Sequence, residues 1–291
     1  MRRALMSDVR TLLAAARQRL GGEDAVWESE LLLSAVLGQS RSWLHAHPEA
    51  VPSAAQAAQF EAWVSRRAMG EPVAYLLGWR GFWTFEVDVG PGCLIPRPET
   101  ELLLEEALAR MPIDAAMDVA DLGTGSGALA LALAQERPQA RVLASDLSAD
   151  ALALARANAR KLGLEARVRC VQGDWYAAVA GACFDLVVSN PPYLGESDPH
   201  LVQGDLRFEP RQALVSGMDG LEALRTLITG APAHLHAGGW LLLEHGAEQG
   251  PAVRELLSEA GFADVQSVRD LQSHERVSVG RWVRVATEGG L

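Results

Sequence analysis

From residue 116 onward, short apolar segments alternate with longer segments that carry apolar residues at helical spacing. Such alternation is typical of strands joined by crossover helices in an α/β sheet. The predicted strands are Met117–Asp121, Arg141–Asp146, Arg167–Gln172, Phe184–Asn190 and Trp240–His245, with a final pair near Val265–Arg269 and Arg276–Val285. The predicted helices are Gly127–Arg137, Ala149–Leu162, Gly220–Leu235 and Pro251–Ala260. This pattern predicts a doubly wound α/β domain.

The beginning of the chain has a different character, because nothing there alternates like a strand. Asp24–Leu37 repeats apolar residues at helical spacing, and Gly38 follows as a stop. Ser53–Met69 forms a second predicted helix, with Ser53 as its N-cap and Gly70 just past its end. The segment therefore predicts a small helical bundle.

Val73–Val89 is rich in aromatic residues, and Gly81 offers a position for a turn. We predict a β-hairpin there. The chain then divides into three expected parts: a helical domain at 1–70, a β-hairpin connector at 71–95 and the α/β domain at 96–291.

A glycine-rich loop, Asp121–Gly127, closes the first predicted strand of the α/β domain. A tight strand-to-helix turn needs glycine where φ is positive or where a ligand approaches the backbone. Asp146 ends the next strand, where a carboxylate can accept hydrogen bonds from both hydroxyls of a ribose. Asp174 and Trp175 follow the third strand, placed to meet an adenine amine and its ring. The candidate cofactor-binding residues are Asp121, Gly123, Thr124, Gly125, Ser126, Gly127, Asp146, Asp174 and Trp175.

The spacing of the loop glycines distinguishes between cofactors. The loop reads G-x-G-x-G after an aspartate, whereas the dinucleotide fingerprint is G-x-G-x-x-G. A P-loop is excluded because no Gly-Lys-Ser/Thr follows. Ala128 continues the helix in place of a cation, which suits a cofactor without phosphates. The loop favours S-adenosylmethionine over a nicotinamide dinucleotide, and purely structural glycines are the remaining alternative.

Asn190-Pro191-Pro192-Tyr193 closes the fourth predicted strand. The Asn190 side-chain oxygen and the Pro191 carbonyl can accept both hydrogens of one planar NH2 group. The lone pair of such a nitrogen is delocalised, and hydrogen bonds to both of its N–H groups should draw it toward a more reactive geometry. Placing the nitrogen in line with the methyl group of a sulfonium contributes further through proximity. Tyr193 can stack on the planar group and exclude water. We therefore predict Asn190, Pro191 and Tyr193 as catalytic, all four residues as substrate-binding, and Asn190 also as a cofactor contact; an ordinary Pro-Pro turn is the alternative.

Two further segments flank this predicted site. Ile95–Glu101 contains two prolines that hold its backbone extended, and Thr100 offers an N-cap for a helix over Glu101–Arg110. The segment is either a rigid strap between domains or part of the active-site wall. Glu209 and Arg211 are either a lid ion pair or ordinary surface charges.

Composition limits the partners and the compartment. The formal net charge of −11 argues against tight DNA binding, because neutralising phosphates dominates nucleic-acid affinity. No apolar run approaches the roughly 20 residues that span a bilayer. The three cysteines, Cys93, Cys170 and Cys183, are scattered, and the seven histidines show no metal-ligand spacing. We expect a cytoplasmic protein that uses no metal and binds neither DNA nor membranes.

The motifs resemble those of the HemK/PrmC-type protein-(glutamine-N5) methyltransferases, which modify peptide chain release factors. The shared segments are Gly70–Tyr75, Phe82-Trp83, Ile95–Glu101, Asp121–Gly127, Gly173–Trp175, Asn190–Tyr193, Phe208–Pro210, Glu275–Val277 and Gly280-Arg281. The resemblance implies a Rossmann-like S-adenosylmethionine-dependent methyltransferase domain, with N-terminal helices that help to recognise a release factor. It also implies that Asn190–Tyr193 hold the glutamine of a Gly-Gly-Gln loop for methylation at N5.

Three other functions stay open from the sequence. Adenine-N6 methyltransferases use the same tetrapeptide on DNA, but they must flip a base and grip phosphates, and no basic recognition domain is evident. A related family methylates a glutamine of a ribosomal protein; the helical domain and the connector favour release factors. A translation-associated binding module without turnover is the third, and the complete set of Asp121, Asp146 and Asn190–Tyr193 speaks against it.

Overall fold

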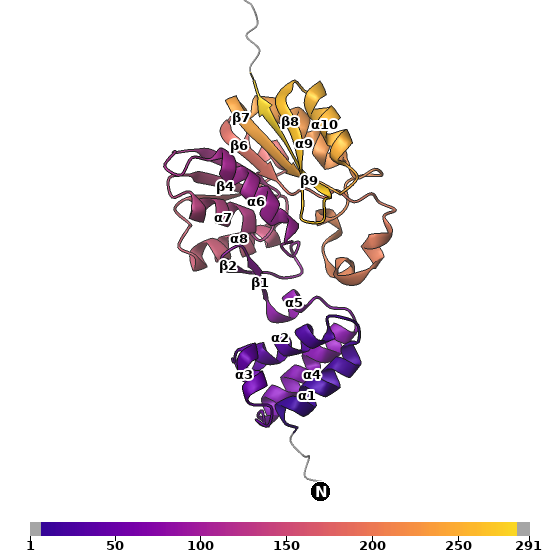
Figure 1. Ribbon diagram of the computed structural model, residues 1–291. Coiled ribbons are helices and arrows are strands. Elements are labelled where there is room, and N and C mark those ends of the chain that lie inside the picture. The colour runs from indigo at the N-terminus through magenta and orange to yellow at the C-terminus, as the bar shows by residue number, and fades with distance from the viewer. Residues whose placement is uncertain (1–6, 284–291) are drawn as a thin grey trace, which may run out of the picture. The chain divides into compact units, whose positions relative to one another are not determined.

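The computed structural model describes residues 7–283 of the chain. The chain divides into two compact units between Gly78 and Trp79 (Figure 1). The first unit is helical, and the second holds a large sheet flanked by helices. Each unit has its own cluster of buried apolar side chains, which is the usual mark of a domain.

The first unit contains the helices α1 Val9–Leu20, α2 Ala25–Leu37, α3 Arg41–Ala46, α4 Ala54–Ala68 and α5 Val73–Leu77. Apolar side chains at helical spacing meet in its core, among them Leu32 and Phe60. Ser53 and Gln56 form a capping box at the start of α4, and Gly38 ends α2 with a φ of 64°. The predicted helical bundle is confirmed, with its cap and its stop.

An antiparallel hairpin of β1 Trp79–Phe82 and β2 Phe85–Asp88 opens the second unit. It is shorter than the predicted hairpin, because residues 73–77 fold as α5. The predicted turn at Gly81 is wrong, since Gly81 pairs with Glu86 inside the ladder. Trp83 takes the turn with a φ of 54°. Its backbone N–H donates to Glu101 at 3.0 Å and its ring N–H to Glu136 at 2.7 Å, and these bonds offset the strain of the left-handed backbone.

The core of the second unit is a seven-stranded sheet with the order β5-β4-β3-β6-β7-β9-β8. The strands are β3 Asp118–Leu122, β4 Arg141–Asp146, β5 Val168–Gln172, β6 Phe184–Ser189, β7 Leu235–Glu244, β8 Phe262–Arg269 and β9 Glu275–Trp282. β3 to β7 run parallel, and β9 pairs antiparallel with both β7 and β8. The strand order reverses between β3 and β6, and open α/β sheets bind ligands at such a switch point. The predicted doubly wound domain is confirmed.

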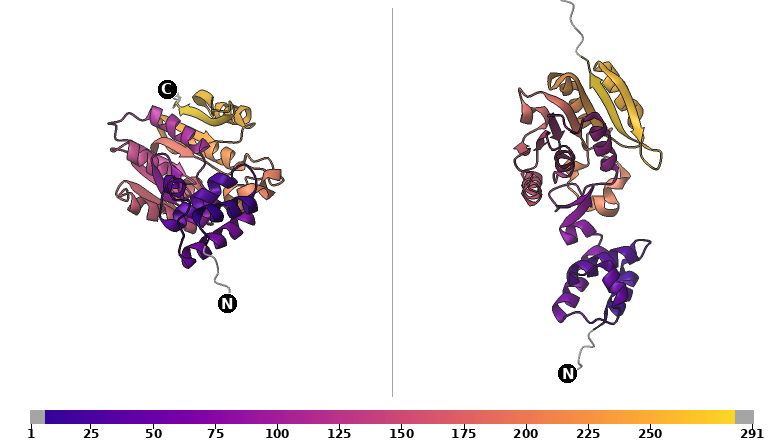
Figure 2. Two further views of the ribbon diagram at one scale, coloured as in Figure 1. Left: turned by 60° about the horizontal axis from the view of Figure 1, so that its bottom comes forward. Right: turned by 60° about the vertical axis from the view of Figure 1, so that its left-hand side comes forward.

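Within the described part of the second unit, five helices cover this sheet: α6 Glu99–Arg110, α7 Ala128–Glu136, α8 Ala149–Lys161, α9 Glu222–Gly230 and α10 Gly250–Glu259. α6, α7 and α8 lie on one face, and α9 and α10 lie on the other (Figures 1 and 2). Both faces of the central strands are therefore buried, which explains their continuous apolar sequences. Three 3₁₀ turns, η2 Pro199–Val202, η3 Gly204–Phe208 and η4 Arg211–Ala213, connect β6 to α9.

The helix predicted over Gly220–Leu235 is wrong beyond Gly230. α9 ends at Gly230, and Pro232 lies in a 3₁₀ turn over residues 231–233. A proline removes a backbone N–H and clashes with the preceding helical turn, so the α-helix does not continue. β7 then begins at Leu235, which pairs with Phe184.

Candidate active site

The glycine-rich loop joins β3 to α7 at the switch point. Gly123, Gly125 and Gly127 all have positive φ, at 78°, 56° and 85°, as the sequence predicted for this turn. A Cβ atom on Gly127 would lie 3.1 Å from the Cβ of Ala155, so this glycine lets α7 pack closely on α8. A Cβ atom on Gly125 would meet nothing within 4 Å. Gly125 therefore faces open space, where a ligand can approach the backbone.

Hydrogen bonds anchor the loop to the neighbouring strand. The N–H groups of Gly123 and Thr124 donate to the Ser145 carbonyl at 2.9 and 2.8 Å. The Thr124 hydroxyl donates to Asp121 Oδ2 at 2.6 Å. Asp121 is 1% exposed, and this burial raises the pKa of its carboxyl to about 7 against the opposing effect of the Thr124 bond. The loop is thus fixed before any ligand binds.

Asp146 ends β4 beside this loop. Its Oδ2 accepts from the Gly125 N–H at 2.9 Å, and its Oδ1 accepts from the Ser148 N–H at 2.8 Å. Each carboxylate oxygen has a further lone pair, so both can still accept from a pair of ligand hydroxyls. Burial raises the pKa of Asp146, and the hydrogen bonds from Ser148 and Gly125 oppose that effect.

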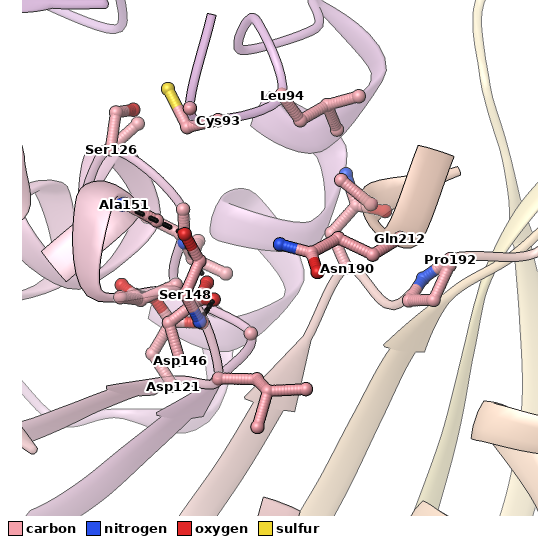
Figure 3. Close-up of a pocket in the computed structure, with 18 of the residues that line it drawn as sticks. Cys93, Leu94, Asp121, Ser126, Asp146, Ser148, Ala151, Asn190, Pro192 and Gln212 are labelled. Atoms are coloured by element: carbon pink, nitrogen blue, oxygen red, sulfur yellow. Dashed lines mark hydrogen bonds between the residues drawn. The ribbon is translucent and has the colours of Figure 1, made fainter. Parts of the chain in front are cut away.

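A cavity of about 170 Å³ lies against the loop and the ends of β4, β5 and β6 (Figure 3). In Figure 3, the side chains of Asp146 and Asn190 lie on opposite sides of this cavity. All the predicted cofactor residues line it except Gly127, which packs α7 against α8. Asp174 is exposed at its edge, and the Trp175 ring would lie 3.4 Å from a Cβ atom on Gly123.

Several residues in the walls of this cavity were not predicted from the sequence. Cys93 and Leu94 line it from the segment before α6, and Gln212 lines it from η4 (Figure 3). These positions carry no recognisable pattern in the sequence. Burial raises the pKa of the Cys93 thiol to about 11. The thiol donates to the Gly90 carbonyl at 3.7 Å.

A second and larger cleft of about 1040 Å³ opens on the other side of the tetrapeptide. Pro191 and Tyr193 line this cleft and not the first cavity. Four residues line both spaces: Leu94, Asn190, Pro192 and Ala213. The tetrapeptide therefore forms the boundary between a compact cavity and an open cleft.

Asn190 is oriented by a threonine. Its Nδ2 donates to Thr100 Oγ1 at 3.0 Å, and the Thr100 hydroxyl donates to Glu244 Oε2 at 2.8 Å. Asn190 Oδ1 is buried and has no hydrogen-bond partner among the described residues. The expected N-cap role of Thr100 is wrong, because α6 starts at Glu99 and Thr100 lies inside its first turn.

The backbone of the tetrapeptide is held from the opposite side. Pro191 is buried. The Tyr193 carbonyl accepts from Gln249 Nε2 at 3.0 Å. Gly220 permits this arrangement, because its φ is 76° and a Cβ atom there would lie 2.3 Å from the Tyr193 carbonyl oxygen. Burial also raises the pKa of the Tyr193 hydroxyl, so the ring stays neutral.

The segment before α6 is fastened by Glu209, whose side chain is fully buried. Its Oε2 accepts from the Ile95 N–H at 3.0 Å, and its other oxygen pairs with Arg97. The suggested Glu209–Arg211 ion pair is wrong, since Arg211 donates instead to the Glu196 carbonyl at 3.3 Å. Burial raises the pKa of Glu209, and the charge of Arg97 opposes that rise.

Two features of the described residues concern metals and membranes. Within residues 7–283, no cluster of three or more His, Cys, Asp or Glu side chains is arranged to hold a metal ion. Among the helices of the same range, none is long and apolar enough to cross a membrane.

Comparison with known proteins gives two family matches and a similar fold. Residues 11–78 match the PrmC N-terminal domain, and residues 98–209 match the Methyltransferase small domain. A Pyrococcus furiosus methyltransferase has a similar fold, with a TM-score of 0.53 and 17% identity over 75% of this chain and 97% of that one.

Relatives in sequence are much closer. The release factor glutamine methyltransferase of Xylella fastidiosa strain Temecula1 is 56% identical over 270 residues, which is 93% of this chain and 96% of that protein. The protein of the same name from Escherichia coli K12 is 45% identical over 271 residues, covering 93% and 97%. At this identity and coverage, the chain belongs to the release factor glutamine methyltransferase family.

Proposed function

We propose that this chain transfers a methyl group from S-adenosylmethionine to the side-chain nitrogen N5 of the glutamine in the Gly-Gly-Gln motif of peptide chain release factors. The observation that carries this proposal is the position of Asn190. Its Oδ1 is buried and has no partner among the described residues, and Asn190 lies at the boundary between the compact cavity and the open cleft. A buried acceptor without a donor is costly, and the NH2 group of a substrate would satisfy it.

The compact cavity fits S-adenosylmethionine. Asp146 keeps lone pairs for ribose hydroxyls, and Gly125 exposes bare backbone beside it. Asp174 and Trp175 stand at the end where an adenine would lie. Among the described residues that line the cavity there is no lysine or arginine, which suits a ligand that carries no phosphate. When bound, S-adenosylmethionine supplies an electrophilic methyl group on a positively charged sulfur.

The protein residues then have three tasks at the acceptor nitrogen. Asn190 Oδ1 accepts one hydrogen of the glutamine NH2 group, and the Pro191 carbonyl accepts the other. Pro192 and Tyr193 wall the cleft around the planar amide, and the Tyr193 ring excludes water from it. The residues hold the nitrogen in one orientation, so most of their contribution is proximity and alignment.

The open cleft suits a loop of a protein better than a small molecule, because it is about six times larger than the cofactor cavity, at about 1040 against 170 Å³. We further propose that the helical domain at 1–70 recognises the body of the release factor and that 71–95 connects it to the methyltransferase domain at 96–291. The reaction belongs in the cytoplasm, where release factors act.

A single assay tests the proposal. The purified protein and S-adenosylmethionine are incubated separately with a release factor, a ribosomal protein and duplex DNA, and the products are analysed by mass spectrometry. One added methyl group on the Gly-Gly-Gln glutamine is the expected result. Methylation of only the DNA or only the ribosomal protein would refute the substrate assignment.

A further inference from the structure

Glu244 is a buried acid that the proposed reaction does not use. It ends β7, is 1% exposed and lines neither the cofactor cavity nor the cleft. Its Oε2 accepts a hydrogen bond from the Thr100 hydroxyl at 2.8 Å, and Thr100 Oγ1 accepts a hydrogen bond from Asn190 Nδ2 at 3.0 Å. The acid is therefore linked to the tetrapeptide through one hydroxyl group.

The direction of these hydrogen bonds follows from their chemistry. An ionised carboxylate can only accept, so it takes the single proton of the Thr100 hydroxyl. The hydroxyl oxygen then has only lone pairs to offer to Asn190, and only the NH2 end of that amide can donate to them. Asn190 Oδ1 must consequently point away from Thr100, and it is the atom left buried without a partner.

We infer that Thr100 and Glu244 are positioning residues that fix the Asn190 amide with its oxygen toward the substrate. This inference rests on the proposed function of Asn190 as an acceptor for the glutamine NH2 group. Neither residue contacts the substrate nitrogen; both act through Asn190. Three separate chain segments thus cooperate to set which end of one amide faces the reaction.

Protonation of Glu244 reverses this arrangement. A neutral carboxyl group donates to Thr100 Oγ1, which frees the threonine hydroxyl to donate to Asn190 Oδ1, and the amide then turns its NH2 group toward the substrate. The charged and titratable neighbours of Glu244 are Glu99 on α6, Arg97 just before that helix, Arg276 on β9 and the Tyr193 ring. Burial raises the pKa of Glu244 to about 7, with Glu99 adding to the rise and Arg276 and Arg97 opposing it.

The first test compares threonine variants in the full-length protein with a release factor as substrate. Thr100→Val keeps the side-chain shape and removes the hydroxyl. Because Thr100 also lines the cofactor cavity, kcat is measured at saturating cofactor. We expect kcat to fall about tenfold, from loss of one buried hydrogen bond that sets orientation, with the substrate KM nearly unchanged. Thr100→Ser restores the hydroxyl and should restore kcat to within about threefold of wild type.

Thr226→Val is the matched control. Thr226 lies on α9, and its hydroxyl donates to the carbonyl of Glu222 in the same helix, its one partner within residues 7–283. This variant also removes a helical threonine hydroxyl, and its kcat should equal that of wild type. A Thr100→Val protein with kcat within threefold of wild type would overturn the inference.

The second test isolates the acid. Glu244→Gln keeps the shape and removes the titration, so the ratio of wild-type to variant kcat is measured from pH 8 to pH 6 at saturating cofactor. Asp121 is present in both proteins, and its own titration cancels in this ratio. We expect the ratio to fall by roughly tenfold toward pH 6, because one pH unit below its pKa only about a tenth of a carboxyl remains ionised.

A flat ratio would overturn the role of Glu244, and this test also decides the matter if Thr100→Val loses cofactor binding. The two possible failures are distinguishable. If wild type does not methylate the release factor, the proposed function fails; if it does and both tests are negative, only the positioning inference fails.

Discussion

Removal of the Asn190 side chain is the most direct perturbation of the proposed mechanism. Asn190→Ala deletes the unpartnered Oδ1, while the Pro191 carbonyl remains as the second acceptor. Thr100 loses a donor but keeps its own bond to Glu244 at 2.8 Å, so no buried hydrogen is left unpaired. The folded state should therefore lose only about 0.5–1.5 kcal/mol, the usual net value of one hydrogen bond.

The barrier to methyl transfer should rise much more. Loss of one preorganised polar group at a reacting centre typically costs ~2.7–4 kcal/mol, which is about 10²–10³ in rate. Asn190→Asp should also turn over slowly, because a carboxylate cannot donate to Thr100 and would compete with Glu244 for its one proton. Tyr193→Phe should be milder, since the ring still lines the cleft.

Single-turnover rates at saturating cofactor measure this effect, and calorimetry with S-adenosylmethionine shows whether the cavity is intact. Asn158→Ala is not a suitable control, because Asn158 bonds three backbone groups of the core. Gln135→Ala is better matched, since that amide is exposed and bonds only Thr84. If Asn190→Ala reacts within threefold of wild type while cofactor affinity is unchanged, the orientation mechanism is refuted.

Four further outcomes are expected. Asp146→Ala should weaken S-adenosylmethionine binding by ~1–3 kcal/mol in calorimetry through lost charge-assisted hydrogen bonds, and unchanged affinity would remove Asp146 from the site. Glu209→Ala should lower the melting temperature and weaken cofactor binding, because the Ile95 N–H and Arg97 lose their buried partner; an unaltered melting curve would contradict this. Burial raises the pKa of Asp121 in the folded state to about 7, so its contribution to stability is present at acid pH and is lost as pH rises through 7. In urea unfolding, the free energy of unfolding of Asp121→Asn relative to wild type should therefore grow by roughly 1.4 kcal/mol per pH unit between about 4 and 7. A difference in free energy of unfolding that stays constant with pH would exclude the pKa shift. A protein that begins at Trp79 should bind cofactor but lose activity on intact release factor, and a full rate would exclude docking by the helical unit.

The sequence predicted those parts of the site that local geometry controls. Gly123, Gly125 and Gly127 were recognisable because a positive φ at each position favours glycine over other residues. The tetrapeptide was recognisable because its four residues are contiguous and follow an apolar strand. The alternation of strands and helices predicted the doubly wound α/β class, whereas the order of the strands in the sheet is known only from the structure.

Contacts between distant segments could not be predicted in the same way. Thr100 lies 90 residues from Asn190 and 144 from Glu244, and no spacing rule joins three such positions. A threonine after a proline near a helix start satisfies the pattern for an N-cap, so its inward direction became visible only with the fold. From the sequence, Glu209 and Arg211 are either an ion pair or ordinary surface charges, whereas the partner of Glu209 in the structure is Arg97, 112 residues away.

The hairpin shows a different limit. Gly81 satisfied the local preference for a turn, but the ladder register placed Trp83 there instead. The bonds from Trp83 to Glu101 and Glu136 come from two separate helices. These tertiary contacts outweighed the local preference for a turn at Gly81, and the residues around position 83 in the sequence do not reveal them.

The two spaces that meet at the tetrapeptide have a thermodynamic consequence. A partition between the cofactor cavity and the open cleft is formed by the four residues that line both: Leu94, Asn190, Pro192 and Ala213. A ligand that orders this partition from one side alters the free energy of binding on the other side. Linkage requires the effect to be mutual, so the factor by which S-adenosylmethionine changes the affinity for the release factor must equal the factor by which the release factor changes the affinity for S-adenosylmethionine.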